Sequence, residues 1–373
     1  MLKNQLHEGD NLEILRRHVP DASIDLIYLD PPFNSNADYH TPDAQGFSDT
    51  WRWDAPTAES YHEFVASHGI PGRALKAFHD LLGTGDALAY LVMMAPRLAE
   101  LHRVLKPMGS LYLHCDPSAS HSLKLLLDAV FGPENFRSEI IWKRTHAHGS
   151  SKRFGPVHDV ILLYSKTLNY YWSDPRTGHS AEYLRKHFKQ VDPETGRNFQ
   201  AITLTGSGVR YGESGRPWKG INPTTVQRHW AIPGKVIDRL GIIGESVQDK
   251  LDALDALGRI YWPSRKPGTP RLKWFADELQ GVSLSDVWSD IPPLSANSME
   301  RLGYPTQKPL VLLERIIAAS SREGDLVLDP FCGCGTALAA AQKLGRRWIG
   351  IDLAPLAIRL CAKRLKKTYK SVL

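Results

Sequence analysis

The sequence lacks long hydrophobic runs. No apolar stretch approaches the roughly 20 residues that a membrane-spanning helix needs. The first ten residues, Met1 to Asp10, also lack the apolar core of a secretory signal peptide. We therefore expect a cytoplasmic protein that has no membrane partner.

Cysteine is scarce, with Cys115, Cys332, Cys334 and Cys361 as its only occurrences. In a reducing compartment so few cysteines do not indicate a disulfide framework. Cys332 and Cys334 form a close pair, but a structural zinc site would need a second ligand pair at suitable spacing. The sequence offers no second cysteine pair, so we expect no bound metal.

The excess of positive charge is small. The 373 residues carry a formal net charge of +6 and give a pI of about 9.0, a mild indication of a polyanionic partner. No internal repeat is evident. The length suffices for an α/β domain with a large insertion, or for two domains.

Both ends of the chain alternate between apolar strands and helical runs, which predicts a doubly wound α/β fold with a mostly parallel sheet. Residues 34–85 have little periodicity and are expected to form long loops and short helices. Strands are expected at 5–10, 23–29, 110–116, 138–143, 159–164, 325–329 and 347–352. Helices are expected at 12–18, 87–105, 120–131, 308–320 and 336–344, with a basic one at the end.

The middle of the chain differs in character. Periodicity weakens, and seven of the ten tryptophans lie between Trp142 and Trp288, interleaved with basic residues. We expect residues 146–300 to be a large insertion, with most of its tryptophans in a core and one or two on a nucleic acid. The flanking residues 1–145 and 301–373 would form the rest of the protein.

Asp30-Pro31-Pro32-Phe33 directly follows the apolar run 24–29, where a strand is expected to end. Ligands bind at the carboxyl ends of strands in open α/β sheets. Asp30 offers a carboxylate, the Pro31 carbonyl meets no N–H on Pro32, and Phe33 offers a flat face for stacking. These groups suit a planar ring with an exocyclic amino group, although the same residues can also simply initiate a turn.

A second motif, Asp329-Pro330-Phe331-Cys332-Gly333-Cys334-Gly335-Thr336, lies between an expected strand and an expected helix. Gly333 and Gly335 form a G-x-G turn whose backbone can approach a ligand closely. Leu338 stands where a dinucleotide fingerprint needs a third glycine. Asp352 ends the next strand, 17 residues after Gly335, and an acid there suits ribose hydroxyls. This pattern favours an adenosine-containing cofactor; a plain tight turn and a helix N-cap role for Asp352 stay open.

The order of these parts along the chain is unusual, because the cofactor turn normally comes first in such a domain. Here it comes last, and Gly9-Asp10-Asn11 resembles a further cofactor-binding strand end. An N-cap role for Asp10 also stays open. Asp352, Asp10 and Asp30 would follow one another in sheet order if the chain ends were joined, so the expected topology is circularly permuted.

Together these motifs resemble the permuted beta class of S-adenosylmethionine-dependent DNA amino-methyltransferases, which methylate adenine N6 or cytosine N4. The resemblance covers Gly9 to about Ser165 and Tyr304 to about Leu365. The catalytic motif beginning with Asp is more typical of adenine enzymes, and the form beginning with Ser of cytosine enzymes. The segment 304–317, YPTQKP followed by LLERII, is similar to the family's segment before the cofactor loop. Cys334 stands where the family more often has Ser.

The resemblance implies S-adenosylmethionine as cofactor and double-stranded DNA as partner, with the middle region recognising the target. It implies a flipped-out adenine stacked on Phe33, whose amino group donates to Asp30 and to the Pro31 carbonyl, with Pro32 completing the catalytic motif. It also leaves room for a homodimer and for a cognate restriction enzyme. The implied cofactor-binding residues are Asp10, Lys308, Asp329, Phe331, Gly333, Gly335, Thr336 and Asp352.

Three alternatives differ from an adenine-N6 methyltransferase. The nearest is the same fold acting on cytosine N4. A DNA-binding protein that has lost its chemistry is a second, which the intact Asp30, Pro31 and Phe33 disfavour. A nicotinamide-dependent oxidoreductase is a third, which Leu338 disfavours.

Overall fold

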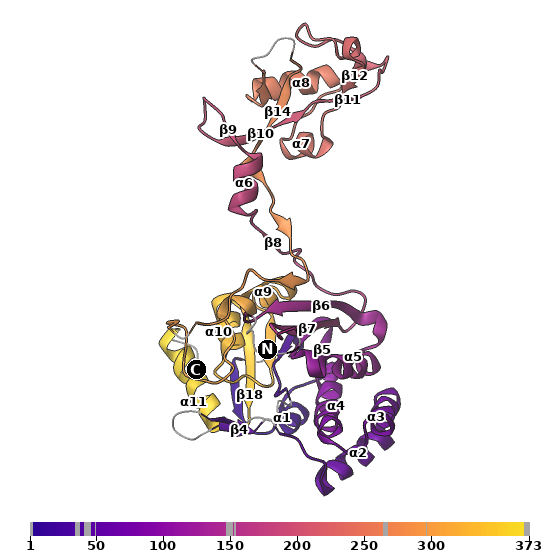
Figure 1. The fold of residues 1–373 in the computed structure, drawn as a ribbon, viewed down its shortest axis with the longest axis vertical. Coiled ribbons are helices and arrows are strands. Elements are labelled where there is room, and N and C mark those ends of the chain that lie inside the picture. Colours follow the sequence, from indigo (N-terminus) through magenta and orange to yellow (C-terminus); the bar gives the residue numbers. More distant parts are fainter. Residues whose placement is uncertain are drawn as a thin grey trace. The chain divides into compact units, whose positions relative to one another are not determined.

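The computed structural model describes residues 3–33, 38–40, 46–48, 50–146, 152, 154–263, 268–295 and 297–368. The chain contains two compact units (Figure 1): unit 1 is Met1–Pro175 with Ser285–Leu373, and unit 2 is Arg176–Leu284. Unit 2 is shorter than the expected insertion 146–300, because strands on both sides of it pair with the sheet of unit 1. Across the described ranges, no helix is long and apolar enough to span a membrane.

Unit 1 is built on an eight-stranded, mostly parallel sheet. Among the described strands of this sheet, antiparallel pairing is confined to β7, and the other seven share one direction. The predicted α/β class with a mostly parallel sheet is therefore confirmed. In sheet order the strands are β1 (Gln5–Glu8), β18 (Arg347–Asp352), β17 (Leu326–Asp329), β2 (Ile24–Leu29), β5 (Leu105–Cys115), β7 (His158–Ser165), β6 (Phe136–Lys143) and β16 (Val287–Trp288).

The first and last long strands of the chain are neighbours: Leu6 of β1 pairs with Gly350 of β18. However, β18 and β17 separate β1 from β2. The expectation that Asp30 follows Asp10 in sheet order was therefore wrong. The connection after β1 crosses two strands before it rejoins the sheet, and the apolar pattern of a strand does not encode which neighbour it will pair with.

Helices cover both faces of this sheet (Figure 1). Separate apolar cores lie on the two faces. The first face carries α1 (Asn11–His18), α4 (Asp86–Val104) and α5 (Pro117–Phe131), with α2 (Ala55–Ser67) and α3 (Gly69–Leu82) packed against α4. The second face carries α9 (Leu310–Ser320), α10 (Thr336–Lys343) and α11 (Pro355–Thr368).

The expectation of loops and short helices between residues 34 and 85 was wrong for its second half. Helices α2 and α3 have 13 and 14 residues. Each buries an i, i+3 apolar pair, Tyr61 with Phe64 and Leu75 with Phe78, and Asp54 caps the first helix by accepting from the Thr57 N–H at 2.9 Å. Glycine and proline at residues 69–72 obscured this spacing in the sequence. Residues 34–37, 41–45 and 49 lie outside the described residues.

Unit 2 has a small core of its own. Trp218 and Trp230 pack edge to face, with ring centroids 6.0 Å apart, among Leu251, Leu254 and Leu272. Its main sheet has the order β13 (Ile260–Tyr261), β14 (Arg271–Phe275), β10 (Asn198–Thr203) and β9 (Gln190–Val191). Two further pairs join β11 (Thr205–Ser207) to β12 (Arg228–Trp230), and β8 (Arg176–Thr177) to β15 (Val282–Ser283). Its helices are α6 (Ala181–His187), α7 (Gly234–Arg239) and α8 (Val247–Ala256).

Candidate active site

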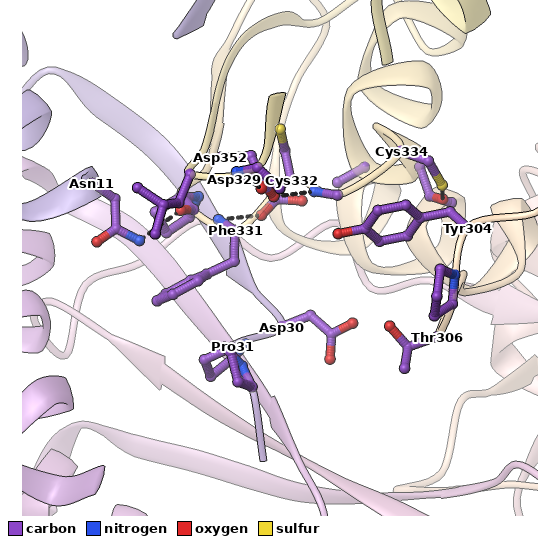
Figure 2. Close-up of a pocket in the computed structure, with 18 of the residues that line it drawn as sticks. Asn11, Asp30, Pro31, Tyr304, Thr306, Asp329, Phe331, Cys332, Cys334 and Asp352 are labelled. Atoms are coloured by element: carbon purple, nitrogen blue, oxygen red, sulfur yellow. Dashed lines mark hydrogen bonds between the residues drawn. The ribbon is translucent and has the colours of Figure 1, made fainter. Parts of the chain in front are cut away.

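Four neighbouring strands of unit 1 deliver carboxylates to one edge of the sheet. Asp352 and Asp329 end β18 and β17, while Asp10 and Asp30 follow β1 and β2. A pocket of about 910 Å³ lies along this edge. Of the twelve predicted site residues, eleven line it: Asp10, Asp30, Pro31, Pro32, Phe33, Lys308, Asp329, Phe331, Gly333, Thr336 and Asp352. The two motifs from opposite ends of the chain thus meet in one cavity (Figure 2).

Asp30 is held by an ion pair. The Lys308 ammonium donates to Asp30 Oδ2, and both side chains are largely buried, at 18% exposed for Asp30 and 10% for Lys308. The second oxygen, Asp30 Oδ1, is buried and has no hydrogen-bond partner among the described residues. Lys308 also lies over the Phe33 ring, 5.3 Å from its centroid. Lys308, predicted to orient its helix or to contact the cofactor, therefore contacts the predicted catalytic acid and ring in this structure.

The backbone of the G-x-G loop is hydrogen-bonded to the Asp352 side chain. The Gly333 N–H donates to Asp352 Oδ2 at 2.8 Å, and the Ala354 N–H donates to Oδ1 at 2.9 Å. Asp352 therefore ties the loop after β17 to the loop after β18 and presents its remaining acceptor positions toward the pocket. Burial raises the pKa of Asp352, while these two backbone bonds act in the opposite direction.

The two glycines of the loop have different neighbours. Both adopt positive φ angles, +51° at Gly333 and +77° at Gly335. A Cβ on Gly333 would lie 3.0 Å from the Tyr304 ring, which faces the pocket (Figure 2). A Cβ on Gly335 would lie 2.3 Å from the Cys361 sulfur of α11, and Gly335 does not line the pocket. Gly335 permits close helix packing behind the loop, whereas Gly333 faces the cavity.

Asp329 lies deepest in the group of carboxylates. It is 3% exposed and its Oδ1 accepts from the Phe331 N–H at 3.1 Å. Burial, reinforced by the negative charges of Asp30 and Asp352, raises the pKa of Asp329 well above its usual range. The positive charge of Lys308 opposes this shift but does not cancel it.

Asp10 is the N-cap of α1, which was the alternative role that the sequence left open for it. Its Oδ1 accepts from the Leu12 N–H at 2.8 Å and the Glu13 N–H at 3.3 Å. Its Oδ2 accepts from Arg97 of α4 at 2.5 Å. The cap does not remove Asp10 from the site, because Asp10 still lines the pocket.

Asn11 and Arg97 line the pocket but were not among the predicted site residues. Arg97 Nε donates to Asn11 Oδ1 at 2.7 Å, and Asn11 Nδ2 donates to the Pro330 carbonyl at 2.7 Å. This chain of bonds joins α4 to the cofactor loop through the start of α1. For Asn11, the sequence signal of a site role was its position directly after the Gly9-Asp10 strand end. For Arg97 there was no such signal, because its place in an expected helix does not distinguish it from other arginines.

The segment before α9 also contributes to the pocket. Thr306 has a φ of +59°, which is unusual for a β-branched residue. Gln307 fixes this turn, because its side chain donates to the Glu300 carbonyl and accepts from the Leu302 N–H, both at 2.9 Å. Figure 2 shows the Thr306 and Asp30 side chains facing each other. Such a strained residue at a cavity is typical of a functional segment.

Thr336 opens α10 beneath the loop. The Thr336 hydroxyl accepts from Arg364 at 2.9 Å.

The four cysteines of the chain are buried free thiols. Within the described part of the chain, no group of three or more His, Cys, Asp or Glu side chains could hold a metal ion.

The comparison with known families decides the identity. A model of the DNA methylase family matches residues 24–363, which include both motifs and the region between them. The chain belongs to this family. This DNA methylase is 32% identical to the type II methyltransferase M.EcaI of Enterobacter cloacae, over 98% of this chain and 70% of that protein.

Two further proteins are similar to the methylase. The DNA adenine methyltransferase YhdJ of Escherichia coli (strain K12) is 24% identical over 96% of this chain and 81% of its own. TTHA0409 of Thermus thermophilus, a putative DNA modification methylase solved with S-adenosyl-L-methionine, is 17% identical, with a TM-score of 0.44. That alignment covers 99% of this chain and 95% of the solved one.

Proposed function

We propose that this DNA methylase transfers a methyl group from S-adenosylmethionine to N6 of an adenine that has been rotated out of double-stranded DNA. The observation that carries the proposal is Asp30 itself, a pocket-lining residue whose buried Oδ1 has no hydrogen-bond partner among the described residues. An ionised carboxylate only accepts hydrogen bonds. Its natural guest is an N–H donor such as an exocyclic amino group.

The size and lining of the pocket support a site for the proposed cofactor together with a base. Its volume of about 910 Å³ is at the upper end of the range for a single small-molecule site. Asp352 and Asp10 offer acceptors to ribose hydroxyls and to an adenine amino group, and Gly333 leaves the loop backbone open to the ligand. Phe331, Asp329 and Thr336 complete the cofactor side, and Lys308 stands between the two sides. Bound S-adenosylmethionine would supply an activated methyl group on a sulfonium.

The residues of the catalytic motif position the base. Because the amino lone pair of adenine is delocalised into its ring, the nitrogen is a poor nucleophile. Hydrogen bonds from that amino group to Asp30 Oδ1 and the Pro31 carbonyl favour a more tetrahedral nitrogen. Phe33 offers the ring face on which the extruded base stacks, and Pro32 fixes the backbone between them. Lys308 keeps the Asp30 carboxylate in place by binding its other oxygen.

Adenine is favoured over cytosine by the leading Asp of the motif and by the adenine specificity named for the similar YhdJ. Cytosine N4 is the second candidate, because its amino group would meet the same two acceptors.

Unit 2 is the proposed target-recognition region, and we assign this role to Arg176–Leu284 in place of 146–300. Circular permutation of unit 1 is part of the same proposal and is supported by the pairing of β1 with β18. A homodimer and a cognate restriction enzyme stay predictions of the family resemblance.

Nucleoside identification tests the proposal. The protein is incubated with methyl-labelled S-adenosylmethionine and unmethylated genomic DNA, and the DNA is digested and separated. Label in N6-methyladenine is the expected result. Label in N4-methylcytosine selects the second candidate, and absence of label contradicts both. Heat-denatured DNA in a parallel reaction shows whether the duplex is required.

A further inference from the structure

A chain of buried polar side chains lies beneath the catalytic motif. The Tyr28 hydroxyl is 2.9 Å from His114 Nδ1, and His114 Nε2 is 3.0 Å from Asp159 Oδ2. These residues are 2%, 0% and 2% exposed. They come from β2, β5 and β7, three neighbours in the sheet, at its pocket edge. We call these three residues the buried polar chain.

The protonation states of the buried polar chain follow from its surroundings. Burial alone would raise the pKa of Asp159, but the His114 hydrogen bond and the positive charges of His114, Lys308 and Arg144 outweigh it and lower the pKa. Burial, reinforced by nearby carboxylates, raises the pKa of Tyr28 well above its usual range. An ionised Asp159 can only accept, so His114 Nε2 is the donor of the bond between them.

Burying a chain of polar side chains against a sheet costs free energy of desolvation. Apolar residues of similar volume would give comparable or higher stability, because buried polar groups must be desolvated. Such networks are instead well suited to fixing one side-chain arrangement when every member has a partner. Here both His114 nitrogens and the Tyr28 hydroxyl have hydrogen-bond partners. Asp159 Oδ1 accepts no hydrogen bond among the described residues, but it forms an ion pair with Arg144 Nε at 2.7 Å.

The arrangement that is fixed is the plane of the His114 ring. Trp142 packs edge-on against it at 5.8 Å and 89°. Phe33 stacks against it, with centroids 5.9 Å apart and planes inclined by 27°. Tyr28 also lies only two residues before Asp30 and lines the pocket. The buried polar chain thus touches both the stacking ring and the strand end that carries the catalytic acid.

We propose that His114, held between Tyr28 and Asp159, is a positioning residue that sets the plane of Phe33 and thereby the alignment of the flipped base with Asp30. This inference rests on the proposed function. It assigns His114 no proton transfer and no contact with substrate. Its effect is geometric, and a displacement of about 1 Å at a reacting group can lower a rate by about a hundredfold.

Tyr28→Phe is the sharpest test, because it removes one hydroxyl and leaves the ring in place. Its matched control is Tyr112→Phe on β5, whose equally buried hydroxyl bonds the Ser320 hydroxyl at 2.6 Å and does not line the pocket. Single-turnover methyl transfer to unmethylated genomic DNA gives the rate, and calorimetry with S-adenosylmethionine gives its Kd. We expect Tyr28→Phe to lower the rate about tenfold or more, with a Kd like that of Tyr112→Phe, which should retain near wild-type activity.

A double-mutant cycle separates positioning from general destabilisation. If the chain acts through Phe33, Tyr28→Phe should have little further effect in a Phe33→Leu background. Asp159→Asn is a second variant with the same expected dependence on Phe33. The inference is overturned if Tyr28→Phe is no slower than Tyr112→Phe, or if its effect persists fully in the Phe33→Leu background. A wild-type protein that transfers no methyl group would instead overturn the proposed function.

Discussion

Lys308 and Asp30 form an ion pair that joins the end of the YPTQKP segment to the proposed catalytic motif across 278 positions of sequence. The pair occupies Asp30 Oδ2 and leaves the buried Oδ1 without a hydrogen-bond partner among the described residues. Charge-assisted hydrogen bonds of this kind are short and directional. Under the proposed function, Lys308 orients the acid by binding one oxygen, and the other oxygen accepts from the target amino group.

The first prediction concerns Lys308→Gln. Without the ammonium, Asp30 loses this ion pair, and we expect the transfer rate to fall about tenfold to a hundredfold because the acid is no longer fixed. The Kd for S-adenosylmethionine should change little. Lys106→Gln is the matched control, since Lys106 binds Asp25 at 2.7 Å and 2.8 Å but does not line the pocket. A large rise in Kd with an unchanged rate would show that Lys308 serves the cofactor instead.

The second prediction separates backbone strain from a steric clash in the cofactor loop. Gly335 and Gly324 have similar positive φ angles, +77° and +83°, but a Cβ would be 2.3 Å from the Cys361 sulfur at Gly335 and in open space at Gly324. Gly324→Ala should therefore cost about 1 kcal/mol of unfolding free energy, from strain alone. Gly335→Ala should cost about 1–3 kcal/mol more and weaken cofactor binding, because α11 must move.

Urea unfolding and calorimetry with S-adenosylmethionine measure these two effects. Equal losses of stability in the two variants would mean that the packing of Gly335 against α11 does not shape the loop.

The third prediction concerns pH. Because the pKa of Asp329 is raised in the folded state, the folded protein binds a proton at Asp329 more tightly than the unfolded chain does. The stabilisation is complete below the ordinary carboxyl pKa of about 4 and is lost as pH rises toward the folded-state value. Asp329→Asn mimics the protonated acid. Its stability relative to wild type should therefore increase across this pH range, by up to about 1.4 kcal/mol for each pH unit.

Denaturant unfolding at a series of pH values checks this expectation. Asp286→Asn, which changes an exposed carboxyl outside the pocket, is the control and should run parallel to wild type. An Asp329→Asn curve that is also parallel to wild type would contradict the burial argument.

Local sequence signals predicted the two ends of unit 1 well. Buried strands that end in Asp352, Asp329 and Asp30 combine an apolar run with a single acid, and that combination places each acid at the carboxyl edge. The order of the strands could not be predicted, because pairing depends on crossovers that no strand sequence encodes. For the same reason, a link such as His114 with Asp159, 45 residues apart, became visible only in the structure.

The tryptophans of the middle region show one feature that the sequence could predict, burial, and one that it could not, the unit to which each residue belongs. Trp142, Trp218, Trp230 and Trp288 are buried, whereas Trp172 and Trp262 are 45% and 44% exposed, so the expected core role holds for four of the seven. However, Trp142 and Trp288 pair across β6 and β16 in the sheet of unit 1. Composition alone could not place this boundary, because an aromatic residue satisfies either core equally well.

In the proposed function, Asp30 accepts a hydrogen bond from the target amino group during methyl transfer. Asp30→Ala and the wild-type protein should be assayed on the same unmethylated DNA with labelled S-adenosylmethionine, with cofactor affinity measured on the same preparations. We expect Asp30→Ala to lose methyl transfer while its Kd for S-adenosylmethionine stays close to that of wild type. Retained turnover in Asp30→Ala would contradict this expectation.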